Sequence, residues 1–302
     1  MGPGRRPSRV ALCSDDVFDR HPFQDRRIAQ RTGLMEQRRS RGDFLVIGIA
    51  WAVTAFLLAP MMVTFPMSLT PEPYMSMPHG QVSFSHYGTL ITDPKWLSAL
   101  RDSVVVGIGA TILAVSIGAA GAIGLWQSKS AIARYLGVLP LLPLIIPAVV
   151  SALAFSRSAV WFGMVDTYAA LIVAHAILGM PFVFLTVSAA LENVDPRTVQ
   201  ASRSLGAGLF RSIWRIVVPN IRPGLLSGSI FAFFTSWDEI VVTMFISSRN
   251  VFTLPRKIWA DLRENIDPAV AAISALMIAI TLIVAIGYIL FKPEGSRSGA
   301  TQ

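Results

Sequence analysis

The sequence has little cysteine and little charge, and each scarcity excludes a class of protein. One cysteine, Cys13, occurs in 302 residues, so the chain has no internal disulfide and no cysteine-rich metal cluster. Charged residues make up 15% of the chain, against roughly 25% in an average soluble domain. Hydrophobic residues make up 53%. This balance excludes an ordinary soluble protein and indicates a membrane protein.

The sequence also lacks the phosphate-binding loop G-x-x-x-x-G-K-[ST], and none of its four lysines follows a glycine. In that loop the backbone holds the phosphates of a nucleotide and the lysine reaches the β- and γ-phosphates. We therefore expect that this chain does not hydrolyse ATP by that route. We also expect that it is not an enzyme and binds no cofactor or metal of its own.

What the chain has instead is long apolar runs, each about as long as the 17 to 25 residues that cross a hydrocarbon core as a helix. Barrel strands would be alternating segments of roughly ten residues, whereas a helix satisfies its own backbone hydrogen bonds in lipid. The sequence thus predicts an all-α, multi-pass membrane protein. Its six transmembrane helices are expected at about Phe44–Leu69, Ser103–Trp126, Tyr135–Phe155, Ala169–Leu191, Leu225–Ile246 and Ala269–Phe291.

The positive charge is distributed unevenly between the two sides of these spans. Of the 26 Lys and Arg residues, 19 lie before Asp43, between spans two and three, between spans four and five, or in the C-terminal tail. By the positive-inside rule, both termini are expected to be cytoplasmic. The net charge of +8 is thus mostly a topology signal. No nucleic-acid partner is expected, because no basic face with stacking aromatic residues is visible.

The two ends of the chain differ from the membrane domain at 44–291. Residues 1–43 mix ten arginines with six acidic residues, a composition typical of a disordered, solvated segment, and residues 292–302 form a short tail. The acidic residues argue against a transit peptide. Met1 and Met35 are both candidate translation starts. Met35 begins MEQRRSRGDFLVIG, a compact basic segment that leads into span one.

Span two carries a stripe of small residues: Ala110, Ala114, Gly118 and Ala122 recur every four residues. Such a stripe lets another helix approach closely and is the ordinary signature of helix contact in membranes. We interpret it as a packing face, with a pore lining as the weaker alternative.

Prolines are expected to disturb spans three and four. Span three contains Pro140, Pro143 and Pro147, each of which removes an intrahelical hydrogen bond, so this helix is predicted to be kinked or broken. Gly179 and Pro181 are predicted to interrupt span four in the same way. A gating helix and a kinked helix held by its neighbours are both open interpretations of span three.

His175 lies in span four as well. A lone histidine in a membrane is a candidate proton relay or ligand. Because no second ligand is visible, we interpret it as a hydrogen-bonded structural residue.

Between spans four and five lies ENVDPRTVQASRSLGAGLFRSIWRIVVPNIRPG, residues 192–224. Asp195 followed by Pro196 is typical of a helix N-cap with proline at the first helical position. Gly206 is predicted to be the left-handed residue that ends this short helix. Both features make residues 196–205 a short helix on a loop that is too polar to insert.

A second helix is predicted after Gly206, and Pro219 and Pro223 are expected to end it before span five. Arg211 and Arg215 lie on its polar face. An exposed apolar stripe on such a loop fits docking to a partner protein, and a helix on the membrane surface is an equal alternative. The apolar face, at i, i+3, i+4 and i+7, consists of Phe210, Ile213, Trp214 and Val217.

This loop resembles the EAA loop of the permease subunits of binding-protein-dependent ABC importers. That loop reads Glu-Ala-Ala, three residues, Gly, nine residues, Ile, any residue, Leu-Pro, and every spacing fits here. The departures are Gln for Glu, Ser for Ala and Val for Leu. The matching positions are Gln200, Ala201, Ser202, Gly206, Ile216, Val218 and Pro219.

The likeness extends from Phe44 to Phe291, and within the family it is strongest to the second permease subunit of spermidine/putrescine-type importers. Four stretches carry this closer likeness. They are LPLLPLIIPAVVSALAF, AHAILGMPFVFLTVSAALENVDP, RPGLLSGSIFAFFTSWDEIVVTMFI and TLPRKIWADLRENIDPAVAAISAL.

The resemblance implies a type I ABC importer permease fold in the cytoplasmic (inner) membrane of a bacterium. It implies four kinds of partner: a second, similar permease subunit that forms a heterodimer with this chain, two cytoplasmic ATPase subunits that bind ATP and Mg²⁺, a periplasmic binding protein, and membrane lipid. The loop would couple the ATPase to the spans, which move between two discrete states. The coupling residues would be Gln200, Ala201, Ser202, Leu205, Gly206, Ala207, Phe210, Ile216 and Pro219.

Two carboxylates stand side by side in span five, in FFTSWDEIVV, residues 233–242. A carboxylate at mid-bilayer costs about 2.5 to 3.5 kcal/mol, and such residues are functional by default. On a continuous helix Asp238 and Glu239 point about 100° apart, so we expect one to meet substrate and the other a neighbouring helix or subunit. For a polyamine-like cation, Trp237 adds a cation–π surface. The alternative is structural pairing with an arginine or serine within the permease dimer.

Other functions stay open at this point. The solute could be another small organic molecule, such as an opine, an amino-acid derivative or a phosphonate. An ion-coupled secondary transporter is a further alternative, although its usual internal repeats are not visible here. An intramembrane protease would need a serine activated by histidine, for which Ser227 and His175 are candidates that share only their location in the membrane.

Overall fold

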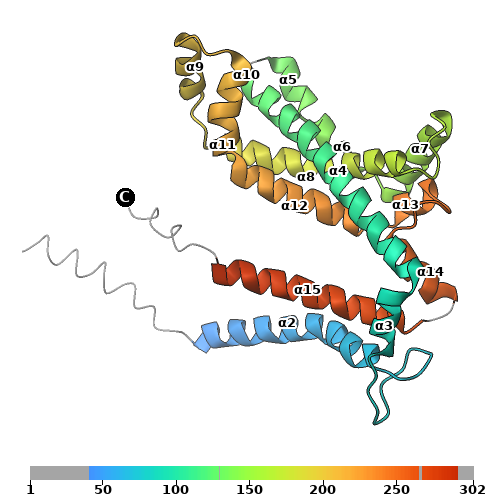
Figure 1. Cartoon of the computed structure of the whole chain (residues 1–302). Coiled ribbons are helices and arrows are strands. Elements are labelled where there is room, and N and C mark those ends of the chain that lie inside the picture. Colours follow the sequence, from blue (N-terminus) through green and yellow to red (C-terminus); the bar gives the residue numbers. More distant parts are fainter. Residues whose placement is uncertain (1–40, 129, 265–266, 292–302) are drawn as a thin grey trace, which may run out of the picture. The chain divides into compact units, whose positions relative to one another are not determined.

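The computed structural model describes residues 41–128, 130–264 and 267–291, and every regular element in these ranges is a helix (Figure 1). The chain divides into two units, residues 1–60 and 61–302, and each is described by itself. The predictions for the head before residue 41, for the tail after residue 291, for Cys13 and for the translation start fall outside the described residues.

The first unit contains most of helix α2 (Arg41–Ser68), which includes predicted span one. Its side chains from Phe44 to Pro60 are exposed, among them Trp51 and Phe56. A helix that is apolar all round requires lipid or other protein as its surroundings. This agrees with the sequence-based assignment of a membrane span.

The second unit contains the remaining helices, connected by short loops. It begins with the end of α2 and runs through α3 (Ser85–Thr92), α4 (Pro94–Gln127), α5 (Ala131–Leu136), η1 (Leu139–Leu141), α6 (Leu142–Ile145), α7 (Ala148–Trp161), α8 (Tyr168–Leu191), α9 (Pro196–Ser204), α10 (Leu209–Ser212), η2 (Ile213–Val217), α11 (Val218–Asn220), α12 (Arg222–Trp237), α13 (Val241–Ile246), α14 (Leu254–Glu264) and α15 (Ala269–Phe291).

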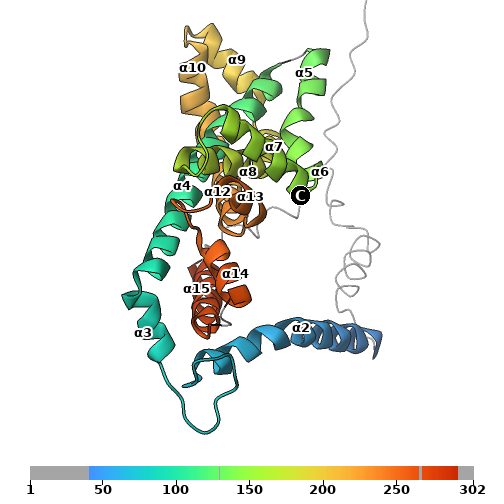
Figure 2. The same ribbon diagram turned by 90° about the vertical axis from the view of Figure 1, so that its right-hand side faces the viewer.

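Helices α4, α8 and α12 pack together and form the centre of this unit (Figures 1 and 2). The four small residues predicted as a packing face of α4 are all buried, which confirms that interpretation. A Cβ atom added at Gly118 would lie 3.1 Å from Cβ of Val183 on α8. One added at Gly228 of α12 would lie 2.9 Å from Cα of Val183. Small residues therefore let these helices approach closely, as is usual in membranes.

Three helices of the described residues are long and apolar enough to cross a membrane: Phe44–Ser68, Pro94–Gln127 and Tyr168–Leu191. The number rises to five if each of two bent helix pairs is one span. The described part of α15 adds a shorter apolar helix, Ala269–Ile283. A multi-pass membrane protein is thus supported, while the total of six spans and the cytoplasmic position of both termini stay predictions.

Predicted span three is broken, as its prolines indicate. Helices α6 and α7 meet at an angle of 118°. Pro147 has an extended backbone and precedes the first residue of α7, a position where its missing N–H costs no helical hydrogen bond. The apolar segment also continues beyond the predicted end at Phe155, because α7 runs to Trp161.

The predicted interruption of span four is wrong. Helix α8 is continuous from Tyr168 to Leu191, with Pro181 inside it. Proline removes one backbone hydrogen bond of the helix, and it is tolerated there because neighbouring helices support this part of α8. Gly179 does not break the helix either. A Cβ atom there would lie 3.1 Å from Cβ of Ala232, so this glycine provides close contact with α12.

Predicted span five is not a continuous helix, which corrects the expectation that its carboxylates lie within one. Helix α12 begins at Arg222, before the predicted start at Leu225, and ends at Trp237. Helix α13 begins at Val241. The angle of about 100° between adjacent helical side chains therefore does not describe Asp238 and Glu239, which lie in the break.

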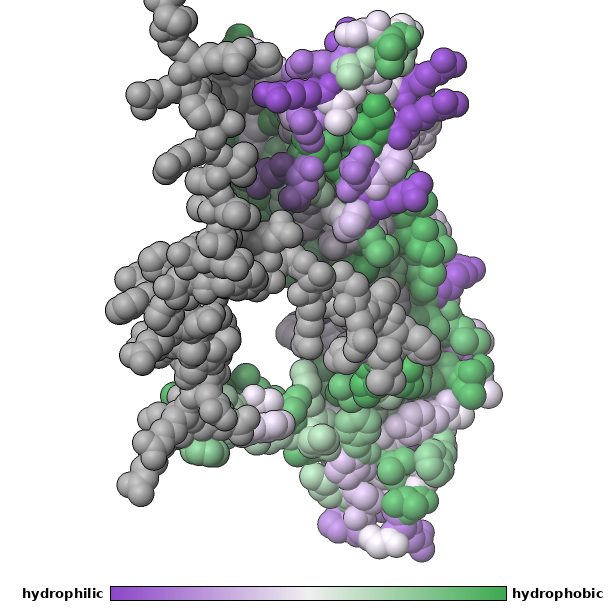
Figure 3. Space-filling model, turned by 90° about the vertical axis from the view of Figure 1, so that its left-hand side faces the viewer, coloured by the Kyte–Doolittle hydropathy of each residue, from purple (hydrophilic) through white to green (hydrophobic). Residues whose placement is uncertain are grey.

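Hydropathy divides the surface in the way expected for a protein in a membrane. In Figure 3, hydrophobic side chains cover much of the face in view, and hydrophilic side chains gather toward the upper end, where Figure 1 has α9 and α10. The loop between α8 and α12, with its polar side chains, thus lies at one end of the second unit.

Candidate functional site

The break between α12 and α13 gives its two carboxylates different positions. The backbone N–H of Asp238 donates to the carbonyl oxygen of Phe234 at 3.0 Å, the last hydrogen bond of α12. Glu239 turns toward α13, and its Oε1 accepts from the backbone N–H of Val242 at 2.9 Å. A carboxylate that accepts from a first-turn N–H stabilises the start of a helix. Glu239 is therefore a capping residue of α13.

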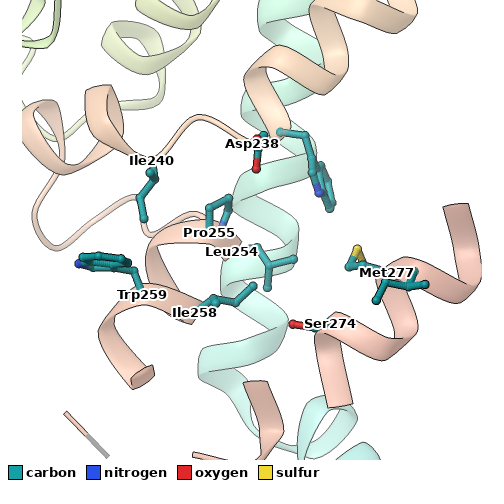
Figure 4. Close-up of a pocket in the computed structure, with 10 residues that line it drawn as sticks. Asp238, Ile240, Leu254, Pro255, Ile258, Trp259, Ser274 and Met277 are labelled. Carbon is teal, nitrogen blue, oxygen red and sulfur yellow. The ribbon is translucent and has the colours of Figure 1, made fainter. Parts of the chain in front are cut away.

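Asp238 instead lines a cavity of about 400 Å³ (Figure 4). Helix α14 contributes Leu254 and Ile258 to the wall, and α15 contributes Ser274 and Met277. In the figure the Asp238 carboxylate lies at the rim and points toward these residues. The other lining residues are Trp237, Ile240, Pro255, Trp259 and Ile278.

Trp237 is held beside Asp238 by stacking. Its ring lies on Phe233, one turn earlier in α12, with ring centroids 5.5 Å apart and planes inclined by 29°. The indole also packs against the cluster formed by α4, α14 and α15. A half-buried, stacked tryptophan next to a carboxylate offers both an aromatic face and a charge to a cation. Trp259 lies across the cavity, and the guanidinium carbon of Arg263 lies 5.9 Å from the centroid of its ring.

The predicted local structure of the cytoplasmic loop is confirmed at its first helix. Oδ1 of Asp195 accepts from the backbone N–H of Arg197 at 2.8 Å, and Pro196 occupies the first helical position of α9. Gly206 follows the helix with φ +87°, in the left-handed region. A side chain at such a φ is strained, so glycine is the residue that suits this turn.

The second helix of the loop differs from the prediction. Phe210 and Trp214 are 75% and 62% exposed, with ring centroids 6.2 Å apart, whereas Val217 is buried. The reason is the π-helical turn η2, in which the N–H of Val218 bonds to the carbonyl of Ile213. That turn shifts the later residues around the axis. The predicted apolar face is therefore split.

The second loop helix ends between its two prolines, as predicted, because α11 ends at Asn220. Pro223 lies in the first turn of α12, so it also belongs to the start of the next helix, which the prediction did not include. The two helical segments meet at an angle of 75° around Ile221, which is fully buried. A proline near a helix start is favourable because its N–H would have no helical partner.

The residues predicted to couple the loop to an ATPase fall into two groups. One group is exposed, most of all Leu205 at 89%, and it also contains Gln200, Ala201, Gly206 and Phe210. The other group is partly buried and connects the loop to the spans: Ser202, Ala207, Ile216 and Pro219.

Ser202, which departs from the alanine of the EAA pattern, connects the two loop helices. Its Oγ lies 2.6 Å from Oγ of Ser212 on α10, and Ser212 is buried. Val199 of α9 is buried in the same cluster as Val217 and Ile221. The exposed residues therefore lie on a helix pair that is fixed to the spans by hydrogen bonding and apolar contact.

Two acidic residues that the sequence analysis did not single out fix the loop between α13 and α14. Asp102 of α4 is buried, and its Oδ2 accepts from the backbone N–H of Phe252 at 3.0 Å while Tyr168 donates to its Oδ1 at 2.6 Å. The adjacent Ser103 accepts from the N–H of Leu254 at 2.7 Å. No local pattern indicates these contacts, because the partners are about 150 residues away.

Asp166 fixes the start of the same loop. Its carboxylate accepts from the hydroxyl of Ser247 at 2.6 Å and from the backbone N–H groups of Ser248, Arg249 and Asn250. Burial alone would raise the pKa of Asp166, but these hydrogen bonds lower it well below its ordinary value of 3.8. Because the pKa is lowered, the anchoring is fully present above pH 3.8 and is lost only as the pH falls through the lowered value.

We expect Asp166→Asn to release this loop, because an amide cannot accept from all these donors and turns its own NH₂ toward N–H groups. Hydrogen bonds to a charged group contribute about 1.5 to 3 kcal/mol, so hydrogen exchange of the amides of 248–250 should quicken by tenfold or more. Exchange in the purified complex measures this. Asp93→Asn is the control, since Asp93 accepts one N–H bond at the start of α4 and asparagine caps equally well. Equal exchange in both variants would contradict the anchoring role.

A metal site has no support in the described ranges, where no three His, Cys, Asp or Glu side chains gather closely enough to hold an ion. The two features of the described residues that suit binding are the Asp238 cavity, for a small solute, and the exposed surface of α9 and α10, for another protein.

Comparison with known proteins gives two similar permeases. The chain is 27% identical over 243 residues to the spermidine/putrescine transport system permease protein PotC of Haemophilus influenzae, covering 79% of this chain and 93% of that protein. It is 29% identical over 231 residues to the molybdenum transport system permease protein ModB of Mycobacterium tuberculosis, covering 72% and 87%.

The fold has a solved counterpart in a bacterial ABC transporter involved in the import of the acidic polysaccharide alginate. That match has a TM-score of 0.62 and 17% identity, and it covers 83% of this chain and 96% of the other. The profile of a protein family, binding-protein-dependent transport system inner membrane component, matches residues 126–294, more than half of the chain. This chain therefore belongs to the family of inner membrane components of binding-protein-dependent transport systems.

Proposed function

We propose that this chain is a permease subunit of an ABC importer and that it forms, with a second permease, the path for a polyamine-like cation delivered by a periplasmic binding protein. The observation that carries the proposal is the position of Asp238. It presents a carboxylate to a cavity of about 400 Å³ whose wall includes two tryptophans. In that setting charge attraction and cation–π contact act on the same ligand.

The chemistry of the cavity favours a cation with methylene spacers. Ammonium groups pair with Asp238, and the aliphatic segments between them contact Leu254, Ile258 and Met277. An oxyanion would meet a carboxylate without a balancing arginine or lysine among the lining residues, and like charges repel. Likeness to permeases for spermidine and putrescine supports the same class of solute.

Energy for transport would come from partner ATPase subunits that bind ATP and Mg²⁺. The exposed side chains of Leu205 and Phe210, on helices fixed to the spans, suit insertion into a groove of another protein. Movement of that groove would be passed to α12 through α11, which joins it directly. The second permease, the ATPases and the binding protein are proposed partners in the inner membrane.

Uptake by the complete importer in liposomes tests the proposed solute. The chain is purified with its partner subunits, and the entry of labelled spermidine, putrescine, molybdate and a neutral amino acid is compared with and without ATP. We expect ATP-dependent entry of the polyamines at least about tenfold faster than that of molybdate, corresponding to about 1.4 kcal/mol of discrimination. Preferred entry of molybdate or of the amino acid would overturn the polyamine assignment.

A further inference from the structure

His175 of α8 connects the two halves of the broken span. The side chain is 1% exposed. Its Nδ1 lies 2.9 Å from Oγ of Ser236, in the last turn of α12. Its Nε2 lies 3.1 Å from Oγ1 of Thr243, in α13. One imidazole ring therefore bridges the helices on both sides of residues 238–240.

The hydrogen bonds of Thr243 fix the direction of this bridge. The Thr243 hydroxyl donates its single proton to the carbonyl oxygen of Glu239 at 3.1 Å. With its proton used there, the hydroxyl accepts from His175, which assigns the ring proton to Nε2. In a neutral ring Nδ1 then has a lone pair, which accepts from the hydroxyl of Ser236. The result is a directed series of hydrogen bonds from Ser236 through His175 and Thr243 to the backbone of Glu239.

The series ends at the peptide bond between Glu239 and the following residue, directly beside Asp238. Apolar packing of Val242 and Ile246 against α7 and α8 also holds α13 in place. Within the break, the Asp238 N–H ends α12 and the Glu239 side chain caps α13. Removing the Nε2–H would leave Thr243, which is fully buried, without its donor, and an unsatisfied buried group is costly. The contact with His175 is a polar link between the end of α12 and α13, and Asp238 and Ile240 lie in the break between these two helices.

We propose that His175, as the neutral Nε2–H tautomer, is a positioning residue that holds the break between α12 and α13 in the geometry that directs Asp238 into the cavity. Only the expected change in transport kinetics rests on the proposed function. The geometry of the break can be tested without any solute.

Substitution of His175 by asparagine or by glutamine distinguishes its hydrogen bond to Ser236 from its hydrogen bond to Thr243. The glutamine amide nitrogen reaches the position of Nε2, so His175→Gln keeps the donor to Thr243. The asparagine amide reaches only the position of Nδ1, so His175→Asn keeps Ser236 and loses Thr243. Thr243→Val removes the hydroxyl, and with it the same hydrogen bond to Nε2 of His175. Thr243→Ser is its matched control because it keeps the hydroxyl.

The first measurement is the transport of spermidine by the complete importer. We expect the KM to rise about tenfold in His175→Asn and Thr243→Val, as for the loss of one buried hydrogen bond, with the maximal rate changed much less. His175→Gln and Thr243→Ser should stay within about threefold of wild type. Wild-type KM values in all four variants, or equal loss of the assembled complex in all four, would overturn the positioning role.

The second measurement needs no solute. Ile240, which lines the cavity, is changed to cysteine in a Cys13→Ser background, where it is the single thiol of the chain. Its rate of reaction with a small charged thiol reagent should change at least about threefold in His175→Asn and not in His175→Gln. An unchanged rate in His175→Asn would contradict the proposal.

The tautomer is tested by ¹³C and ¹⁵N solid-state NMR of the complex in lipid, with the signal assigned by its loss in His175→Gln. The Nε2–H form is expected, and an Nδ1–H ring or an imidazolium would refute the direction of the bridge. If wild-type importer does not transport polyamines, the proposed function fails, while the thiol and NMR results still decide the role of His175.

Discussion

Asp238→Asn is expected to lower the uptake of a polyamine at least about tenfold, while the complex with the partner subunits is recovered normally. The substitution keeps the shape of the side chain and removes its charge. Asp238 lies at the rim of the cavity, and the two ion pairs of the described residues do not include it. Loss of a charge pair with the solute weakens binding by about 2 kcal/mol or more. Initial rates over a range of polyamine concentrations measure the effect.

Glu239 provides the matched control for this prediction. In Glu239→Gln the side-chain oxygen still accepts from the N–H of Val242, so uptake should stay within about threefold of wild type, because the cap is retained. Glu239→Ala removes the cap and is expected to lower the free energy of unfolding by about 1 kcal/mol. If Asp238→Asn transports normally and Glu239→Gln does not, the assignment of the two carboxylates is reversed.

Leu205→Asp should reduce recovery of the ATPase subunits with this chain at least about tenfold. Leu205 is 89% exposed, directly before Gly206, so the change does not disturb the packing of the chain itself. A charge in the apolar centre of a docking surface costs about 2 kcal/mol or more. Co-purification from membranes under mild extraction, followed by ATPase activity, measures the loss.

The control for Leu205→Asp is Val82→Asp, which places the same acid on an exposed apolar residue of the loop between α2 and α3. Gly206→Pro offers a second approach, because proline fixes φ near −65° and the turn requires +87°. We expect it to lose the ATPase as well. Normal recovery in both loop variants would eliminate this surface as the docking site.

Local patterns in the sequence predicted the local structure well. The Asp195 cap, the helical start at Pro196 and the left-handed turn at Gly206 depend on residues within one or two turns of each other, so the sequence contains all that is needed. The same holds for the small residues of α4, whose spacing of four puts them on one side of a helix. The break after Pro147 follows from the chemistry of proline alone.

The predictions failed where distant segments decide the outcome. Pro181 stays inside a continuous α8 because α4 and α12 pack against this helix, which its own sequence neighbourhood does not show. The second loop helix has its apolar residues split because a π-helical turn intervenes between Phe210 and Val217. The break at residues 238–240 was missed because the apolar run continues through it, and hydropathy does not distinguish one helix from two.

Composition, apolar run length and the EAA spacing are properties of the chain alone, and they were enough to show that this protein is helical, that it lies in a membrane and that it resembles binding-protein-dependent permeases. It took the fold to show that Asp238 faces a cavity, that Glu239 caps a helix and that His175 bridges the two halves of a span. The difference lies in distance along the chain. The bridging hydrogen bonds of His175 join residues 61 and 68 positions apart, and only the packing of α8 against α12 and α13 brings them together.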